Sequence, residues 1–445
     1  MVTPAPTVRH DGDVAVAPTR RLSLGRPDLD EVTVLTLWLV LLFGLPERLV
    51  VPAVGAAGAP AALLSLGLFA WWLLARVVPS LTVGGSQPLR QALVVLGWIT
   101  LLVYMIAVLR GLPGVQQRAA DRYLLALAGL SGVALVIADG VRTRARLDTL
   151  LKRVTLGGAA LAMMGLVHQF TGFVYSTWVH LPGLALNREV FQGVQRGQLE
   201  RISGTANHPI GYGVGLALIL PLALHYALSA EPGRERQYRV AVAATVAAGI
   251  PLAISRSAVI TVAIGLLVLG ISWSWRRRVN ALGVLAVSLV ALQVLLPGRL
   301  ITLVNLFRNA DADNSVTART RDYAAVFDYI SDHRWFGLGP GTFLPDEYLQ
   351  LDNQAMKFML EGGLVGVVAI VLLYTTGVRL ARAARRAAPD LETRQLGQCL
   401  AGIIVAAGVA CFSFDAFSYA FYLAVLAVAL GAAGALWRLT IPEAT

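Results

Sequence analysis

The chain is a succession of apolar runs separated by short breaks that are charged or rich in proline and glycine. Each run is roughly 16 to 22 residues long, close to the roughly 20 residues that a helix needs to cross the hydrocarbon of a bilayer. The runs lie at residues 31–50, 61–79, 91–109, 121–138, 151–171, 208–229, 239–254, 257–275, 279–296, 354–376, 397–414 and 417–437. The pattern predicts an all-α fold, a polytopic membrane helix bundle of about 12 transmembrane helices.

Two of the connections between these runs are long, at residues 172–207 and 297–353. Loops of more than about 12 to 15 residues are usually functional or disordered. The second long loop, between the ninth and tenth runs, has apolar residues at helical spacing: Tyr323, Val326, Phe327 and Ile330. This spacing predicts an amphipathic helix that lies on the outer membrane surface or packs over the bundle.

The basic residues between the runs predict the orientation of the chain. They cluster in alternate connections: Arg142, Arg144, Arg146, Lys152 and Arg153, then Arg234, Arg236 and Arg239, then Arg276, Arg277 and Arg278, then Arg379, Arg382, Arg385 and Arg386. Because cytoplasmic connections carry an excess of lysine and arginine, these clusters predict a multi-pass protein of the cytoplasmic (inner) membrane with both termini cytoplasmic.

The same pattern predicts the domain organisation. Residues 1–30 are rich in proline and charge and contain no apolar signal-peptide segment, which predicts a disordered cytoplasmic tail. Residues 31–437 are expected to form a single transmembrane domain, and residues 438–445 a short cytoplasmic tail.

Composition supports the assignment to a membrane. The 445 residues are 56% hydrophobic and 14% charged, with a mean hydropathy of +0.67, whereas soluble domains are about 25% charged. The net charge of +11 comes from arginines scattered between apolar runs, which form no continuous patch for a nucleic acid.

Few residues are suited to metal or disulfide chemistry. Cys399 and Cys411 share one apolar run and lie about 18 Å apart if that run is helical. The six histidines show no HxxxH spacing, and the acidic motif Asp311–Asp313 is not preceded by a strand, unlike the motif of nucleotide-sugar transferases that it resembles. We therefore predict no metal and no cofactor.

Several arginines are predicted to lie on the outward side, against the trend of the other basic residues. Arg201 precedes the sixth run, Arg256 lies in ISRSAV between two apolar segments, and Arg319 and Arg321 open the predicted amphipathic helix. Each alone is also explained as a solvated loop charge or, for Arg256, as a side chain that reaches the interface. Together they indicate a bound anion, because guanidinium groups bind phosphate oxygens bidentately.

Polar residues at the start of the tenth run form a second candidate group. In LDNQAMKFMLEGGLVG, Asp352 is the candidate catalytic carboxylate, and it or Asn353 can also cap the helix. Lys357 and Glu361 stand four residues apart and either pair with each other or support the site. Further candidates for acceptor contact or loop support are His208, His333, Tyr323, Gly339 and Gly341. The turn FGLGPGTF, which contains the two glycines, either brings N–H groups to a ligand or simply reverses the chain.

These segments resemble a known family. RISGTANHP, SRSA, FDYISDHRWFGLGPGTF and DNQAMKFMLEGGLVG, each at the outward end of a predicted span, are similar to the O-antigen ligase and Wzy-type polysaccharide polymerase family over roughly residues 200 to 370. The resemblance implies a GT-C-like glycosyltransferase of twelve helices that moves a glycan, without metal, from a polyprenyl diphosphate to an acceptor hydroxyl. It also implies that Arg201 and Arg256 bind the diphosphate, and Arg319 matches a further family arginine.

The sequence departs from the family at several positions. The ligases carry a histidine, proposed as the general base, where this chain has Asp352, and Tyr323 stands at a Trp-like position. An HP pair is replaced by His333 and Arg334, and Ile210 replaces an asparagine. The missing histidine favours a polymerase, or a ligase to another acceptor, over a lipopolysaccharide ligase.

We therefore predict an inverting, metal-independent bacterial glycosyltransferase of cell-envelope biogenesis, a polymerase or ligase with an extracytoplasmic active site. Its expected partners are a polyprenyl diphosphate-linked glycan, an acceptor glycan or glycolipid, and membrane lipids, with no nucleic acid. The alternative is a transporter of an anion or lipid-linked sugar. Transporters place polar residues at mid-membrane, whereas the ionisable residues here gather at the outward ends of the runs. The sugar, the linkage and the oligomeric state are not predicted.

Overall fold

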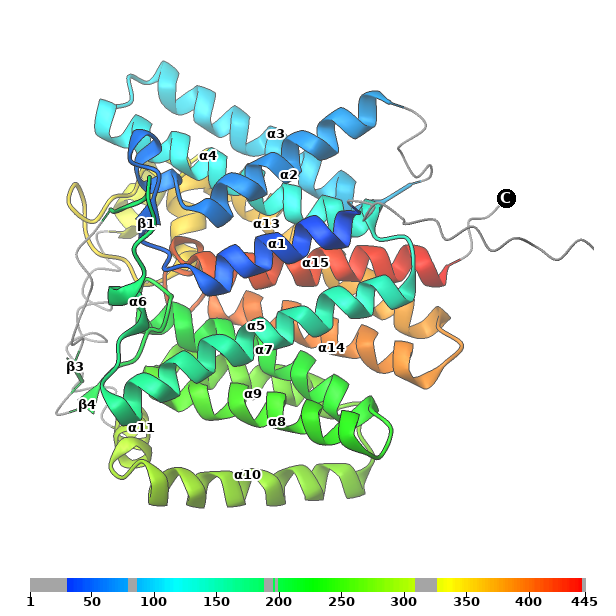
Figure 1. Ribbon diagram of the computed structural model, residues 1–445. Helices are drawn as coiled ribbons and strands as arrows, with labels where there is room; N and C mark the ends of the chain where they lie inside the picture. The colour runs from blue at the N-terminus through cyan, green and yellow to red at the C-terminus, as the bar shows by residue number, and fades with distance from the viewer. Residues whose placement is uncertain (1–29, 79–85, 188–194, 197–198, 309–325, 442–445) are drawn as a thin grey trace, which may run out of the picture.

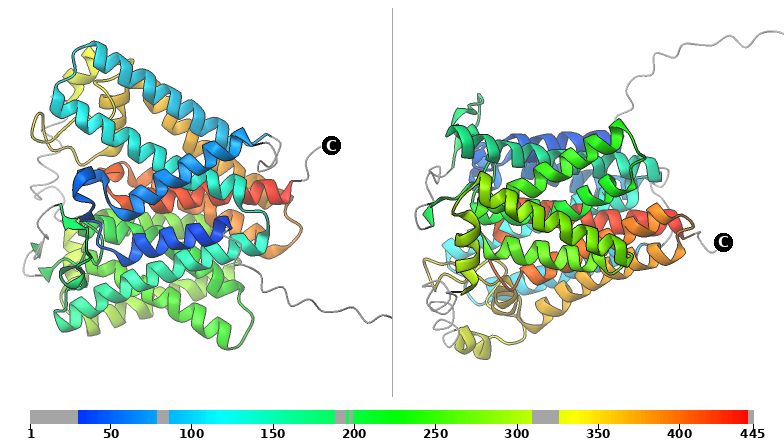
Figure 2. Two further views of the ribbon diagram at one scale, coloured as in Figure 1. Left: turned by 45° about the horizontal axis from the view of Figure 1, so that its top comes forward. Right: turned by 90° about the horizontal axis from the view of Figure 1, so that it is seen from below.

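The computed structural model describes residues 30–78, 86–187, 195–196, 199–308 and 326–441 as a bundle of helices that run roughly parallel or antiparallel to one axis (Figures 1 and 2). The helices are α1 (Glu31–Gly44), α2 (Pro60–Val77), α3 (Pro88–Leu109), α4 (Gly114–Leu135), α5 (Arg144–Thr171), α6 (Tyr175–Trp178), α7 (Pro209–Ser229), α8 (Arg234–Gly249), α9 (Arg256–Gly270), α10 (Trp275–Leu295), α11 (Arg299–Arg308), α13 (Gln354–Ala387), α14 (Leu391–Ala410) and α15 (Ala420–Thr440).

Shorter elements lie at the ends of these helices. They are the 3₁₀ segments η1 (Pro52–Ala57), η4 (Ile250–Ala253) and η5 (Ala416–Ser418), the π-helical segment η3 (Val136–Gly140), and the strands β1 (Leu49–Val50), β2 (Ala185–Leu186), β3 (Gln195–Arg196) and β4 (Leu199–Glu200). β1 pairs antiparallel with β2, and β3 pairs antiparallel with β4.

Each of the twelve predicted runs overlaps one α-helix, so the all-α fold is confirmed. Within the described residues, eight helices are long and apolar enough to cross a membrane: α2, α3, α4 with η3, α5, α7, α10, α13 and α15. α1 and α9 are shorter apolar helices. The protein is thus a multi-pass membrane protein, while the count of twelve spans stays a prediction.

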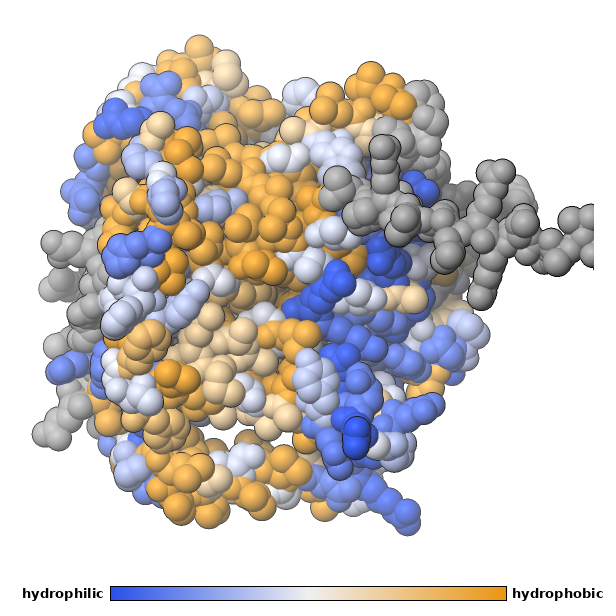
Figure 3. Space-filling model, in the orientation of Figure 1, coloured by the Kyte–Doolittle hydropathy of each residue, from blue (hydrophilic) through white to orange (hydrophobic). Residues whose placement is uncertain are grey.

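The two ends of the bundle differ in composition. α1 begins and α15 ends at one end, and α5, α8 and α10 begin there with arginine-rich turns (Figure 1). We call the opposite end, where α1 leads into η1, α8 into α9 and α14 into α15, the loop end. Hydrophobic side chains cover the flank between the two ends (Figure 3), as expected for a surface in contact with lipid.

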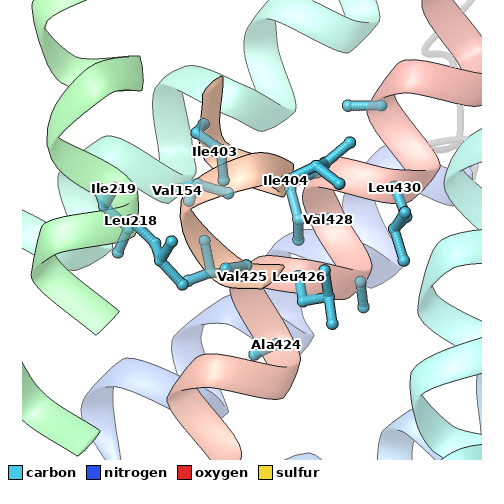
Figure 4. Packing of buried hydrophobic residues seen from close by; sticks show 14 of the residues in the cluster. Val154, Leu218, Ile219, Ile403, Ile404, Ala424, Val425, Leu426, Val428 and Leu430 are labelled. Atoms are coloured by element: carbon cyan, nitrogen blue, oxygen red, sulfur yellow. The ribbon is translucent and has the colours of Figure 1, made fainter. Parts of the chain in front are cut away.

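α7 and α15 form the centre of the bundle. The apolar windows of these two helices are 89% and 83% buried, whereas that of α10 is 0% buried, which puts α10 at the edge. Small residues allow α15 to pack closely against α4. A Cβ on Gly431 of α15 would lie 2.7 Å from the carbonyl oxygen of Ala134 of α4. Figure 4 shows the aliphatic side chains that fill this core, among them Val154, Leu218, Ile219, Ile403, Ile404, Val425 and Leu426.

One predicted helix boundary is wrong. The first run ends as a helix at Gly44 and not at residue 50, because Pro46 disfavours a helical conformation at the residue before it. At the other end of the chain α15 continues to Thr440, and Arg438 donates to the carbonyl oxygens of Ala138 and Val141, while the start of the C-terminal tail stays a prediction. The predicted N-terminal tail, apart from residue 30, lies outside the described residues.

The second long loop contains more helix than predicted. α11 was not expected from the pattern, and residues 326–332 are helical as predicted, with Val326 buried against Phe343 and Leu360 while Phe327 is 62% exposed. This helix therefore packs over the bundle through Val326. The earlier part of the predicted amphipathic helix lies outside the described residues.

α13 is broken at Gly363, and the glycine-rich turn fills the break. Gly363 has φ 60° and ψ −167°. The N–H groups of Leu338 and Gly339 donate to the carbonyl oxygens of Leu360 and Glu361, at 2.8 and 3.0 Å. In return, the carbonyl oxygens of Arg334 and Trp335 accept from the N–H groups of Leu364 and Val365. The break leaves backbone groups that lack helical partners, and the turn satisfies them.

This contact corrects the expectation for FGLGPGTF. The turn neither presents the N–H groups of Leu338 and Gly339 to a ligand nor simply reverses the chain; it is a strap across α13. Arg110 also donates to the carbonyl oxygen of Gly337 at 2.8 Å, which fixes the strap to the end of α3. Gly337, Gly339 and Gly341 all have positive φ, so the glycines serve this close approach.

We predict that Gly363→Ala destabilises the protein and Gly362→Ala does not. A Cβ on Gly363 would lie 2.4 Å from the carbonyl carbon of Trp335, and its φ and ψ are accessible almost only to glycine, at a cost of about 1–3 kcal/mol for other residues. A Cβ on Gly362 meets no atom within 4 Å. Thermal unfolding of both purified variants, followed by tryptophan fluorescence, checks this; equal midpoints would contradict the role of the strap.

Candidate functional site

Arg201 is fixed to the turn that joins α8 to α9. Its Nε donates to the carbonyl oxygen of Ala253 at 2.9 Å, and the N–H of Ile202 donates to that of Leu252 at 3.1 Å. Arg299, which is 2% exposed, donates to the same Leu252 oxygen at 3.1 Å and to the carbonyl oxygen of Glu200 at 3.2 Å. Two arginines therefore hold the segment before α7 against the unwound turn before α9.

The same turn positions Arg256. Ile254 is buried and has a φ of 43°, which is unusual for a β-branched residue and redirects the chain after η4. Ser255 then caps α9 by accepting from the N–H of Ala258, and Arg256 is the first residue of the helix. Arg256 and Ala253 are three residues apart, so their Cα atoms are separated by at most about 11 Å. Arg201 and Arg256 thus share one backbone junction.

His208 stands at the start of α7. It is the N-cap, and its Nδ1 accepts from the N–H of Ile210 at 3.1 Å. A neutral imidazole whose Nδ1 accepts a hydrogen bond carries its proton on Nε2, so the ring offers a donor there. The ring also contacts that of Tyr419, with centroids 5.8 Å apart.

Asp352 lies directly before Asn353, the residue that precedes α13. Asn353, and not Asp352, is the N-cap, and accepts from the N–H of Met356 at 3.2 Å. The next residue, Gln354, donates its N–H to the carbonyl oxygen of Phe414 and accepts from the N–H of Phe417. The helix start is therefore fixed to the 411–419 loop between α14 and α15, directly after Asp352.

That loop also contacts the start of α9. Ser257, next to Arg256, donates to the carbonyl oxygen of Ser413 at 3.1 Å. The N-termini of α9 and α13 therefore lie on either side of one short loop, and α7 packs against α9. Helix N-termini carry partial positive charge and attract anions.

Charges from several of these parts act on His208 and Tyr419. Burial lowers the pKa of His208 from 6.5 to about 4, with a further decrease from the positive charges of Arg201 and Arg48 and an opposing increase from Asp352. Burial raises the pKa of Tyr419, and Asp415 and Asp352 raise it further while Arg201 lowers it. Arg201, His208 and Asp352 are thus close enough to act on common neighbours, with His208 neutral at physiological pH.

Lys357 and Glu361 have separate partners. Lys357 Nζ donates to Asp415 Oδ2 at 2.8 Å, so the ion pair observed for Lys357 is not the one within the helix. Glu361 is buried, its Oε1 accepts from the N–H of Phe343 at 3.4 Å, and it lines a cavity of about 30 Å³ with Tyr123 and Pro340. Glu361 therefore supports the strap, and Lys357 supports the 411–419 loop.

The remaining candidates fall elsewhere. Arg319, Arg321 and Tyr323 lie outside the described residues. His333 ends the helix at residues 326–332, and its carbonyl oxygen accepts from the N–H of Gly337, so it belongs to the start of the strap. Gly339 and Gly341 lie in the strap itself.

Several residues of the site were missed by the sequence reasoning. They are Glu47, Arg48, Arg299, Asp415 and Tyr419. Each lies outside the predicted candidate segments, and nothing in its local sequence distinguishes it from an ordinary connecting residue. Cys399 and Cys411 are both buried and not disulfide-bonded. Among the described residues, no three His, Cys, Asp or Glu side chains lie together as metal ligands would.

Comparison with known proteins identifies one segment. Residues 241–371 match the O-antigen ligase family, which confirms the predicted resemblance over that part of the chain. The match contains Arg256, the strap and Asp352, whereas Arg201 and His208 precede it. A search of curated proteins found no match. The similarity to O-antigen ligases, over this segment alone, suggests a membrane glycosyltransferase of the ligase or polymerase type.

We predict that the protein becomes less stable as the pH falls from about 6.5 to about 4, and that His208→Asn reduces this loss. Because the pKa of His208 is lower in the folded protein than in the unfolded chain, the unfolded chain binds the additional proton in this window. Asparagine retains the N-cap without titrating. Unfolding midpoints measured against pH check this, and parallel curves for the two proteins would contradict it.

Proposed function

We propose that this membrane protein, with its O-antigen ligase segment at residues 241–371, transfers a glycan from a polyprenyl diphosphate carrier to the hydroxyl of an acceptor sugar. The observation that carries the proposal is the shared junction of Arg201 and Arg256 beside Asp352 at the loop end. Cationic groups for a diphosphate and a carboxylate for an attacking hydroxyl are the groups that such a reaction requires.

Arg201 and Arg256 bind the diphosphate in this proposal. Their guanidinium groups complement phosphate oxygens, and the N-termini of α7, α9 and α13 add positive potential at the same place. As the bond to the sugar breaks, negative charge increases on the leaving diphosphate, and fixed cations stabilise it more strongly than they stabilise the bound donor. His208 contributes an Nε2–H donor while neutral.

Asp352 receives the acceptor. The acceptor oxygen attacks the anomeric carbon from the face opposite the diphosphate, and a new C–O bond forms as the old one breaks. The bonding electrons leave with the polyprenyl diphosphate, the hydroxyl proton passes to the Asp352 carboxylate and then to water, and the configuration inverts. Arginine charge stabilises the leaving group, so the step requires no second carboxylic acid and no metal.

The position of α10 supports lateral entry of the lipid. None of its residues is buried, and it connects through α11 to the start of α9, where Arg256 Nη1 donates to the carbonyl oxygen of Leu306 at 3.4 Å. We place the isoprenoid chain in the bilayer beside α9 and α10, with its diphosphate at the loop end. The arginine-rich opposite end faces the cytoplasm, so the reaction takes place on the outer face of the cytoplasmic membrane.

Arg201→Ala and Arg256→Ala are each expected to weaken the binding of farnesyl diphosphate, a soluble isoprenoid diphosphate, by about 10- to 100-fold, since each removes a charge-assisted contact. Arg277→Ala is the control, because Arg277 is an exposed arginine at the opposite end. Titration of the purified proteins in detergent checks this. Equal losses in all three variants would point to non-specific charge attraction and contradict the site.

Asp352→Asn is expected to lower kcat for glycan transfer by at least about 100-fold, the effect of removing a general base, and to leave farnesyl diphosphate binding unchanged. The assay measures glycan transferred from lipid-linked donors extracted from the source cell. Asp346→Asn, an exposed carboxylate in the loop before α13, is the control. Movement of the donor across proteoliposomes without a new glycosidic bond would contradict the proposal and favour a transporter.

A further inference from the structure

Arg48, in the short connection after α1, binds the segment before α7. Arg48 is 8% exposed, its Nε donates to Asn207 Oδ1 at 2.5 Å, and its Nη2 donates to the carbonyl oxygen of Asn207 at 2.6 Å. These residues are 159 positions apart in the chain. Both oxygens of one asparagine are thus bound by a single guanidinium group, in the residue directly before His208.

Glu47 holds the same segment from its other side. Its Oε2 accepts from the N–H of Asn207 at 3.0 Å, and its own N–H donates to the carbonyl oxygen of Thr205 at 3.0 Å. The connection is itself anchored, because β1 follows Arg48 directly and pairs with β2. Thr205 to Asn207 therefore cannot shift without breaking several hydrogen bonds.

The charge of Arg48 also reaches the site. It acts with that of Arg201 to keep His208 neutral, against the opposing effect of Asp352. Glu47 in turn acts on Tyr419, whose ring contacts His208. The contacts of Arg48 therefore orient the chain before His208, and its positive charge lowers the pKa of the imidazole.

We propose that Arg48 is a positioning residue for glycan transfer: its two hydrogen bonds to Asn207 hold His208 beside Arg201 in the orientation that stabilises the charge developing on the leaving diphosphate in the transition state. The inference rests on the proposed function. Only arginine suits the position, because Nε and Nη2 form a rigid fork that matches two neighbouring oxygens, whereas lysine presents a single flexible ammonium group. Lysine would preserve the positive charge and lose the orientation.

The test separates orientation from charge. Arg48→Lys is expected to lower kcat about 10-fold and to leave farnesyl diphosphate affinity within about twofold, because the charge remains. Arg48→Gln is expected to weaken that affinity about 10-fold as well, because the charge is lost. Asn207→Ala combined with Arg48→Lys should add little to the loss in kcat, since both changes break the same contact.

Arg438→Lys is the matched control. Arg438 also binds two backbone oxygens through its Nε and Nη2, those of Ala138 and Val141, but at the end of the bundle opposite the site. Its substitution should lower the unfolding midpoint as much as that of Arg48 and leave kcat unchanged. Equal kcat losses in the two lysine variants, or wild-type kcat in Arg48→Lys, would overturn the inference.

A second readout does not depend on transfer. In full-length protein labelled with ¹³C-histidine, the signal missing from His208→Asn identifies His208, and its titration by NMR reports the local charge from Arg201, Arg48, Asp352 and the neighbouring Tyr419. Arg48→Gln should shift this titration to higher pH and Arg48→Lys should not. If the titration shifts in Arg48→Gln but the wild-type protein transfers no glycan, only the proposed function is contradicted. If the titration does not shift in Arg48→Gln, the inference about Arg48 is overturned.

Discussion

The site depends on the need to satisfy backbone groups where a helix is interrupted among apolar neighbours. The turn between α8 and α9 exposes the carbonyl oxygens of Leu252 and Ala253, and no helical N–H reaches them. Arg201, Ile202 and Arg299 donate to them instead. An unsatisfied polar group in such surroundings is costly, so this requirement brings the segment before α7 against the start of α9.

The same requirement explains the second interruption. α13 breaks at Gly363, and the strap supplies the donors and acceptors that the helix lacks there. The part of α13 before the break is then held at both ends, by the strap near Glu361 and by the 411–419 loop near Gln354. Asp352 stands at the end of a short, fixed helical segment. A group held in this way requires little reorganisation to receive a substrate.

Much of the fold is predictable from the sequence, because runs of apolar residues and arginine clusters are local signals. α11 was missed because its 10 residues, although mostly apolar, are too few to suggest a span. In the candidate site, Arg201, Arg256, His208 and Asp352 were found because charged or polar residues at the ends of apolar runs are conspicuous. Arg48 and Asp415 were not, because their importance comes from partners far away in the chain, Asn207 and Lys357.

Ile254 has a consequence for how the protein tolerates change. Its left-handed backbone would suit glycine, yet the side chain is fully buried, so glycine would relieve the torsion and leave a void. Glycine would therefore not improve the turn at Ile254. The conformation of this turn is imposed by the packing around it. Substitutions in that surrounding shell, even without contact to any ligand, are therefore transmitted to the orientation of the helix that begins with Arg256.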